Sequence, residues 1–277
     1  MNYKTSPMNH ETRCAWGTTD PVYIAYHDLE WGVPTYDDQE LFELLILEGA
    51  QAGLSWITIL KRREGYERAF DGFEVDKVAQ YDEEKYEELL HNDEIIRNKS
   101  KLKYAIKNAR VFQKIQQEFG SFSEYIWGFT DHKIIFNHPL ELNEMCCSSL
   151  LSQQVSKDLM RRGMRFVGPV IMYSYLQSIG VINDHLQTCY RYTEAVRDLM
   201  LSKLKFTLLG YDRLRKLEAF KALSNEAIEA FCITLIAQVE AGEITHKGKN
   251  YTIKAPKQGL ILTVNDSSFT VITAKAL

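Results

Sequence analysis

The sequence contains no apolar run approaching the roughly 18–20 residues that a membrane-spanning helix requires. Its first 14 residues hold no apolar stretch, so we expect no signal peptide, no membrane partner and a cytoplasmic location. The five cysteines are too few and too irregularly spaced for the disulfide framework of a secreted protein. In bulk the chain is ordinary, with 277 residues, 45% hydrophobic and 25% charged, which excludes a wholly disordered chain.

Acidic residues are missing from one stretch of this slightly acidic chain. The net charge of −4 argues mildly against a nucleic-acid partner, but the distribution matters more than the sum. No Asp or Glu occurs from Arg97 to Lys114, where seven residues are basic. A shorter basic cluster spans residues 157–165, with Asp158 as its one acid. Such runs are usually solvated helix faces, and the alternative is an anion-binding surface.

The hydrophobic pattern changes near residue 190. Before it, the pattern predicts helices over residues 55–70, 83–91, 101–119, 149–163 and 169–179, with Asp20 (before Pro21) and Asp37 at helix starts. After it, helices are predicted over 211–223 and 225–241, the second capped by Ser224. Strand-like alternation follows at 251–254, 260–264 and 269–273, with a hairpin turn at 265–268.

We therefore expect a mainly α protein with a small C-terminal α+β appendage. The predicted boundary lies after Tyr192, giving a helical domain over 1–192 and an extension over 193–277. The first part carries 21 basic and 28 acidic residues, a net charge of −7. The second carries 12 basic and 9 acidic residues, a net charge of +3.

Cysteine and histidine occur in a spacing that suits a metal. His185 and Cys189 are separated by one helical turn, and Cys14 and His27 stand far upstream. Two thiolates and two imidazoles would complete a tetrahedral zinc site. Four protein ligands leave no open position, so such a zinc would be structural. The ordinary alternative is a buried cysteine beside an unrelated histidine.

Aromatic residues are concentrated near the N-terminus: Trp16, Tyr23, Tyr26, Trp31 and Trp56. Any one of them suits core packing. Together they also suit a pocket for a flat polar ring, and a cationic base would gain cation–π attraction there.

Glu48 interrupts an apolar helical stripe. Leu41, Leu44 and Leu45 define the stripe, and its next position is residue 48, where an apolar side chain is expected. A carboxylate there either lines a cavity as an acceptor for a bound ligand or lies in water at a frayed helix end before Gly49.

A short polar turn at residues 95–101 (IIRNKSK) lies between two helical patterns and opens the basic run. A helix–hairpin–helix turn of this kind offers backbone N–H groups and lysines to a phosphate.

Together these features resemble the DNA-3-methyladenine glycosylase I family. The matching stretches are 13–16 (RCAW), 20–34 (DPVYIAYHDLEWGVP), 47–58 (LEGAQAGLSWIT), 95–101, 166–168 (FVG) and 181–185 (VINDH) followed by Cys189. The resemblance covers residues 13–190, and long motifs in the right order make it specific.

The resemblance implies an all-α helix–hairpin–helix enzyme that excises 3-methyladenine from alkylated double-stranded DNA. In the family one structural zinc is held by residues matching Cys14, His27, His185 and Cys189. The base pocket matches Trp16, Tyr23, Tyr26, Glu48 and Trp56, with Glu48 as the catalytic residue. DNA contacts are expected at Arg97, Lys99 and Lys101 on phosphates, and at Gly53 and Leu54 beside the extruded nucleotide. The expected enzyme is a monomeric hydrolase of the N-glycosidic bond, with the free base as its product.

Three features depart from the family pattern. The hairpin lacks the glycine common in such turns, residues 145–147 read Met-Cys-Cys where no alignment is evident, and the tail has no counterpart. Two rival functions remain: a catalytically silent DNA-binding protein on the same fold, and a zinc-stapled helical interaction module. Release of free 3-methyladenine from methylated DNA distinguishes them from the enzyme.

Overall fold

The computed structural model describes residues 12–17 and 20–277 and divides into two compact units. The first contains Trp16–Asn137 and Met145–Asp184. The second contains His138–Glu144 and His185–Leu277, together with residues 12–15. The boundary predicted after Tyr192 falls within helix α11 (Tyr190–Lys203).

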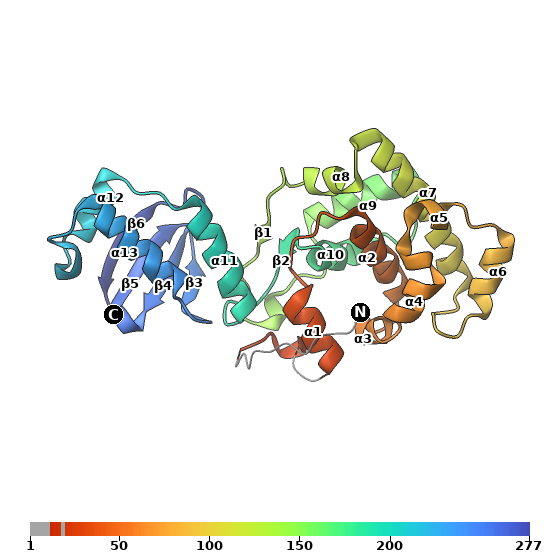
Figure 1. Cartoon of the computed structure of the whole chain (residues 1–277), viewed down its shortest axis with the longest axis horizontal. Helices are drawn as coiled ribbons and strands as arrows, with labels where there is room; N and C mark the ends of the chain where they lie inside the picture. Colours follow the sequence, from red (N-terminus) through yellow and green to blue (C-terminus); the bar gives the residue numbers. More distant parts are fainter. Residues whose placement is uncertain (1–11, 18–19) are drawn as a thin grey trace. The chain divides into compact units, whose positions relative to one another are not determined.

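The first unit is helical, apart from one pair of very short parallel strands (Figure 1). Its elements are α1 (Pro21–Leu29), α2 (Asp38–Gln51), α3 (Trp56–Leu60), α4 (Arg63–Ala69), α5 (Val75–Ala79), α6 (Glu83–His91), α7 (Lys99–Phe119), α8 (Phe122–Gly128), β1 (Ile135–Phe136), α9 (Leu150–Arg162), α10 (Pro169–Ser178) and β2 (Ile182–Asn183). Side-chain caps fix several starts: Asp20 accepts from the Val22 N–H, and Asp37 from two N–H groups in the first turn of α2.

The core of this unit forms around α2, whose residues from Leu44 to Ala50 are all buried. The amphipathic α7 packs against α2, and the Phe42 and Phe112 rings meet edge to face, 5.2 Å apart. Phe112 also stacks on Phe122 at 4.0 Å. A helix buried on nearly every side is rigid, and this is the element that carries Glu48.

One predicted helix is interrupted in the structure. The stretch 55–70 forms α3 and α4, separated at Lys61 and Arg62. Beyond the break, a Cβ added to Gly65 would lie 2.7 Å from the Glu94 side chain, and the Arg63 guanidinium binds Glu30 and Glu43. Contacts with residues far away in the sequence therefore set the direction of α4. Local helical periodicity contains no information about these contacts, so it predicted one continuous helix.

The second unit places helices on one face of an antiparallel sheet (Figure 1). Its helices are α11, α12 (Leu208–Leu214) and α13 (Asn225–Ala237), and its strands are β3 (Ile244–Lys247), β4 (Asn250–Ala255), β5 (Leu260–Asn265) and β6 (Val271–Ala276), in the order β3-β4-β5-β6. The expected mainly α fold with a C-terminal sheet is confirmed.

The predicted details of this unit hold in part. The three predicted strands and the Ser224 cap are present, whereas β3 was not predicted. The helix predicted over 211–223 ends at Leu214, and a short 3₁₀ turn at Glu218–Phe220 follows it. At the predicted hairpin turn, the Asn265 side chain accepts the N–H groups of Ser267 and Ser268.

Across residues 12–17 and 20–277, no helix combines the length and the apolar character needed to cross a bilayer.

Candidate active site

The apolar stripe of α2 ends in a buried carboxylate. Leu41, Leu44 and Leu45 are buried, and Glu48 is only 3% exposed. The alternative of a frayed helix end in water is therefore wrong, because α2 continues to Gln51. Burial raises the pKa of Glu48 to about 8, since the charged form of a carboxyl group is disfavoured inside a protein.

Aromatic rings from three elements lie close to one another around this pocket. Trp16 lies in a 3₁₀ turn before α1, Tyr23 and Tyr26 lie on α1, and Trp56 begins α3. The Trp16 ring centroid is 5.7 Å from that of Tyr23, and the Tyr26 centroid is 5.5 Å from that of Trp56. Burial, with a smaller contribution from the Glu48 charge, raises the pKa of Tyr26 well above its usual range.

These side chains line a cavity of about 370 Å³, within the size range of small-molecule sites. All five predicted pocket residues contribute to it: Trp16, Tyr23, Tyr26, Glu48 and Trp56. The remaining wall contains Trp31, Gln51, Met145, Cys146, Cys147, Val170, Tyr173, Ser174 and Gln177. Tertiary packing has thus gathered one carboxylate and several rings around a single space.

One wall of the cavity was not predicted and comes from α10. Tyr173 and Gln177, one helical turn apart, both donate hydrogen bonds to the same oxygen of Asp184, at 2.7 and 2.6 Å. Asn137 donates to the other oxygen at 2.7 Å. Asp184 is 1% exposed, so a buried acceptor holds both wall residues in place. Tyr173 and Gln177 are four residues apart and so share one face of a helix, and this spacing was the sequence signal that could have identified them.

The Met-Cys-Cys stretch also belongs to the cavity wall. Residues 145–147 precede α9, and the side chains of Cys146 and Cys147 are both exposed. The segment whose alignment with the family was not evident from the sequence therefore borders the predicted base pocket.

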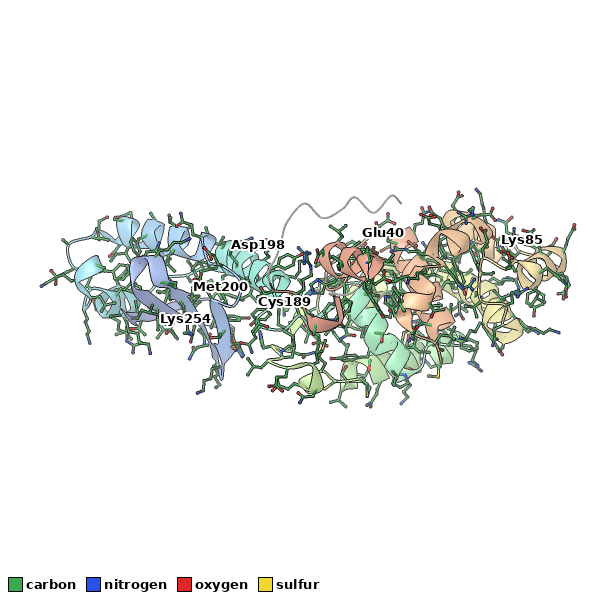
Figure 2. The ribbon with its side chains drawn as sticks, turned by 90° about the horizontal axis from the view of Figure 1, so that it is seen from below. Glu40, Lys85, Cys189, Asp198, Met200 and Lys254 are labelled. Carbon is green, nitrogen blue, oxygen red and sulfur yellow. The ribbon has the colours of Figure 1, made fainter. Side chains whose placement is uncertain are left out.

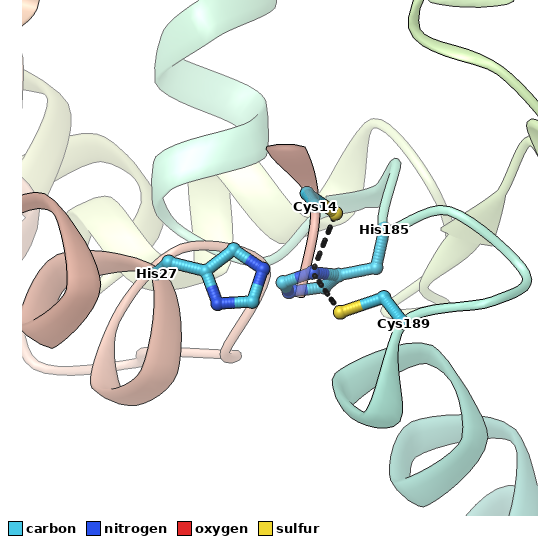
Figure 3. A group of neighbouring side chains, drawn as sticks. All are labelled: Cys14, His27, His185 and Cys189. Atoms are coloured by element: carbon cyan, nitrogen blue, oxygen red, sulfur yellow. Dashed lines mark hydrogen bonds between the residues drawn. The ribbon is translucent and has the colours of Figure 1, made fainter. Parts of the chain in front are cut away.

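A separate group of side chains could hold a metal ion (Figure 3). Cys14, His27, His185 and Cys189 are all buried, and their possible ligand atoms lie within 4.8 Å of one another. The His185 Nδ1 atom is 3.7 Å from Cys14 Sγ and 3.6 Å from Cys189 Sγ. The four residues therefore form one cluster in space, although His185 and Cys189 lie in the turn before α11 and not on a helix.

Neighbouring groups suit these residues to cation binding. The His27 Nδ1 atom lies 2.9 Å from an Asp28 carboxylate oxygen, which favours a proton on Nδ1 and leaves Nε2 for a metal. The Leu186 N–H donates to Cys14 Sγ at 3.4 Å. Hydrogen bonding to Cys189 and burial hold the pKa of Cys14 far above its usual range, and a bound cation would reverse this preference.

The predicted phosphate-binding turn lies between α6 and α7. Arg97 and Lys99 are exposed, and the Asn98 side chain caps α7 by accepting the Lys101 N–H at 3.0 Å. No residue from 92 to 98 has a positive φ. The loop is therefore built without the backbone conformation that requires glycine, which accounts for the missing glycine.

Gly53 and Leu54 form a tight turn after α2. Gly53 has φ +80°, which favours glycine, and the Leu54 side chain is 37% exposed. The Lys101 ammonium donates to the carbonyls of Ala50 and Ala52, at 2.8 and 2.5 Å. Lys101 therefore binds the end of α2 directly, with one donor remaining, and partial burial lowers the pKa of Lys101.

Comparison with known proteins separates the chain into two parts. Residues 16–192 match the family described as methyladenine glycosylase. Residues 199–275 match a family described as a protein of unknown function. The two matches lie on either side of a short stretch within α11.

Individual relatives cover about two thirds of the chain. The DNA-3-methyladenine glycosylase 1 of Escherichia coli is 44% identical over 180 residues, which are 65% of this chain and 96% of that protein. A crystal structure of a 3-methyladenine DNA glycosylase I has a TM-score of 0.63 at 44% identity, covering 65% of this chain and 98% of that one. A Staphylococcus aureus structure concerning 3-methyladenine recognition has a TM-score of 0.62 at 41% identity, covering 64% and 94%.

Proposed function

Because the chain belongs to the methyladenine glycosylase family, we propose that it hydrolyses the N-glycosidic bond of 3-methyladenine in alkylated DNA. The observation that carries the proposal is the buried Glu48 carboxyl group in an aromatic cavity of about 370 Å³. An apolar pocket with one acidic group suits a flat ring that bears positive charge. A silent DNA-binding protein would have no need for a buried carboxyl group with a raised pKa.

In this proposal the protein extrudes the damaged nucleotide and holds its base in the cavity. Unstacking costs a few kcal/mol and is easiest for a damaged base. Trp56 stacks on the ring, while Trp16, Tyr23 and Tyr26 supply the remaining aromatic contacts. N3-methylation makes adenine cationic and weakens the glycosidic bond, so the leaving base needs little protonation before water attacks C1′.

Glu48 responds to the charge of the base. With a pKa of about 8 the carboxyl group is mostly protonated at neutral pH when the cavity holds no cation. A cationic base in contact with it lowers that pKa and favours the carboxylate. Glu48 then accepts hydrogen bonds from the adenine edge and balances the positive charge. The pocket therefore favours the alkylated base over neutral adenine.

The Cys14, His27, His185 and Cys189 cluster is proposed to hold one structural Zn²⁺. Two thiols and two imidazoles are an ordinary donor set for this ion, and the buried surroundings match a closed site. With four protein ligands the ion would supply stability and have no open position for substrate.

DNA is proposed to contact the hairpin and the turn after α2. Arg97 and Lys99 are exposed and suit phosphate contacts, and the half-exposed Leu54 suits the gap left by the extruded nucleotide. Lys101 would fix the position of this turn through the Ala50 and Ala52 carbonyls, and its third donor is available to a phosphate.

Residues 193–277 are proposed to be accessory to the chemistry, which a single chain performs as a monomer. Every residue lining the cavity precedes this tail. The E. coli relative is matched over 96% of its length by 180 residues of this chain, close to the length of the family match at 16–192. We expect a chain ending at Lys203, after α11, to bind zinc and release the base. If the shortened chain loses both zinc binding and base release, the tail is part of the catalytic core.

The deciding experiment is release of free 3-methyladenine from methylated duplex DNA, measured by chromatography. We expect release by the wild-type chain and far slower release by the Glu48→Gln variant. A well-folded wild-type protein that binds DNA and releases no base would favour the silent binding protein.

A further inference from the structure

The C-terminal sheet presents an unusual face on the side that its helices do not cover. Side chains alternate along each strand, and the inward positions of β5, Leu260, Leu262 and Val264, are buried. The helices lie on the inward side of the sheet, and Lys254 belongs to the outward set (Figure 2). We refer to this outward set of side chains as the open face.

Four threonines form a row across the open face, one from each strand. The register pairs Thr245 with Thr252, Thr252 with Thr263, and Thr263 with Thr273. Since neighbouring strands lie about 4.8 Å apart, the row spans roughly 14 Å. Two asparagines, Asn250 and Asn265, are paired in the adjacent row.

Lysines stand on both sides of the threonine row. Lys247 pairs with Asn250 in one neighbouring row, whereas Lys254 and Lys275 both pair with Ile261 in the other. All three lysines are exposed, and within the described part of the chain none of them forms an ion pair.

Acidic and aromatic residues are missing from this face. The 22 residues of β3 to β6 include no Asp or Glu. Apart from the imidazole of His246, their one aromatic ring is that of Tyr251, which points inward and is buried. Two acids directly flank the strands. The Glu243 carboxylate, before β3, accepts the Glu240 N–H, and the Asp266 carboxylate, after β5, lies 2.9 Å from Nε2 of the inward-facing His246. The open face is therefore positively charged and carries a row of hydroxyl groups.

We propose that the open face binds the sugar–phosphate backbone of duplex DNA, giving this chain a second DNA contact outside the glycosylase pocket. Lysines supply charge, and threonine hydroxyl groups donate hydrogen bonds to phosphate oxygens. Without aromatic rings the face has no platform for stacked bases, so it does not suit single-stranded nucleic acid. The proposal rests on the proposed function, because DNA is the substrate there.

The test compares two triple variants of the full-length chain on undamaged duplex DNA, by fluorescence anisotropy over a salt series. Lys247→Gln, Lys254→Gln and Lys275→Gln together remove the charge of the open face. Lys203→Gln, Lys216→Gln and Lys221→Gln remove three exposed lysines from the helical part of the same unit. Both changes alter net charge equally, so nonspecific charge effects cancel.

We expect the open-face variant alone to weaken DNA binding, by more than about fivefold at low salt. It should also flatten the salt dependence by about 0.9 in slope for each phosphate that is no longer neutralised. A second variant, Thr252→Val with Thr263→Val, keeps the strands and removes two hydroxyl groups. It should weaken binding about twofold or more without changing the slope. Unchanged melting temperatures serve as the folding control.

Equal affinities and slopes for the two lysine variants would overturn the proposal and leave an acidic protein surface as the alternative partner. A loss of affinity seen with single-stranded RNA and absent with duplex DNA would overturn it as well. Base release is measured separately on methylated DNA. If the wild-type chain releases no 3-methyladenine while the open-face variant loses DNA affinity, the proposed function fails and the second DNA contact stands.

Discussion

In the helical unit the carboxyl groups of Glu48 and Asp184 are buried, whereas the buried positions of the C-terminal strands are all apolar or aromatic. The sheet follows the simple alternation of a half-buried strand and keeps its lysines outside. The helical unit breaks the apolar pattern of α2 at Glu48, which lines the cavity. Departures from a folding pattern, rather than agreement with it, indicate where ligand chemistry is to be sought.

The largest expected effect concerns the metal cluster. Cys189→Ala should abolish stoichiometric zinc binding and lower the melting temperature by more than about 10 °C, since binding energy of a closed site contributes directly to folding. Zinc content by mass spectrometry and thermal unfolding measure this.

Cys232 on α13 is the matched control, because it is a buried cysteine outside the cluster. Cys232→Ala should leave zinc content at one per chain and lower the melting temperature by only a few degrees, through weaker packing. If the wild-type protein contains no metal and Cys189→Ala leaves the melting temperature unchanged, the proposal of a structural zinc is wrong.

Glu48→Gln tests the buried carboxylate as a catalytic group. We expect base release to fall by roughly 10²–10³-fold, the range for removing one positioned electrostatic group. Glu40 lies on the same helix, and its carboxylate is exposed. The Glu40→Gln variant should therefore excise the base at the wild-type rate. Equal rates for both variants would show that Glu48 has no part in catalysis.

Glu48→Gln should also stabilise the folded chain at alkaline pH. The pKa of Glu48 is raised from 4.5 to about 8 in the folded chain. Its stabilising contribution is therefore complete below about pH 4.5 and is lost as the pH rises through 8. We expect Glu48→Gln to match wild type near pH 4.5 and to exceed it above pH 8, by on the order of a few kcal/mol. Urea unfolding at both pH values measures this; a constant difference would contradict a raised pKa.

Trp56→Ala should weaken binding of free 3-methyladenine by about 1–3 kcal/mol, because the base can no longer stack on an aromatic ring. Trp56→Phe retains a ring and should recover much of the affinity. Calorimetric titration with the free base distinguishes the two variants, and identical affinities for all three proteins would place the base elsewhere in the cavity.

The smallest effect is expected at the hairpin. Arg97→Gln with Lys99→Gln should reduce the salt dependence of DNA binding by about 0.9 in slope for each phosphate left without its cation. Lys77→Gln with Lys85→Gln is the control, because these lysines pair with Glu74 and Glu88 in the same unit. Equal slopes for the two pairs would place the DNA-binding surface of this unit elsewhere.

Much of the fold was predictable because its signals are local. The Asp20, Asp37 and Ser224 caps lie where a short polar side chain precedes a helical pattern. The break between α3 and α4 was not predictable, because it depends on the contact of Gly65 with Glu94, 29 positions away. Strand β3 was missed since four residues carry too little alternation to stand out.

The sequence by itself determined which residue types were available to the site: the Cys and His spacing, the N-terminal aromatic residues and the carboxylate at the end of an apolar stripe. Only folding decided that Glu48 is buried, that Asp184 holds Tyr173 and Gln177 in the cavity wall, and that Lys101 binds the carbonyls at the end of α2. Caps and periodicity depend on a few neighbours along the chain, whereas desolvation and the pKa it sets depend on every group packed around an atom.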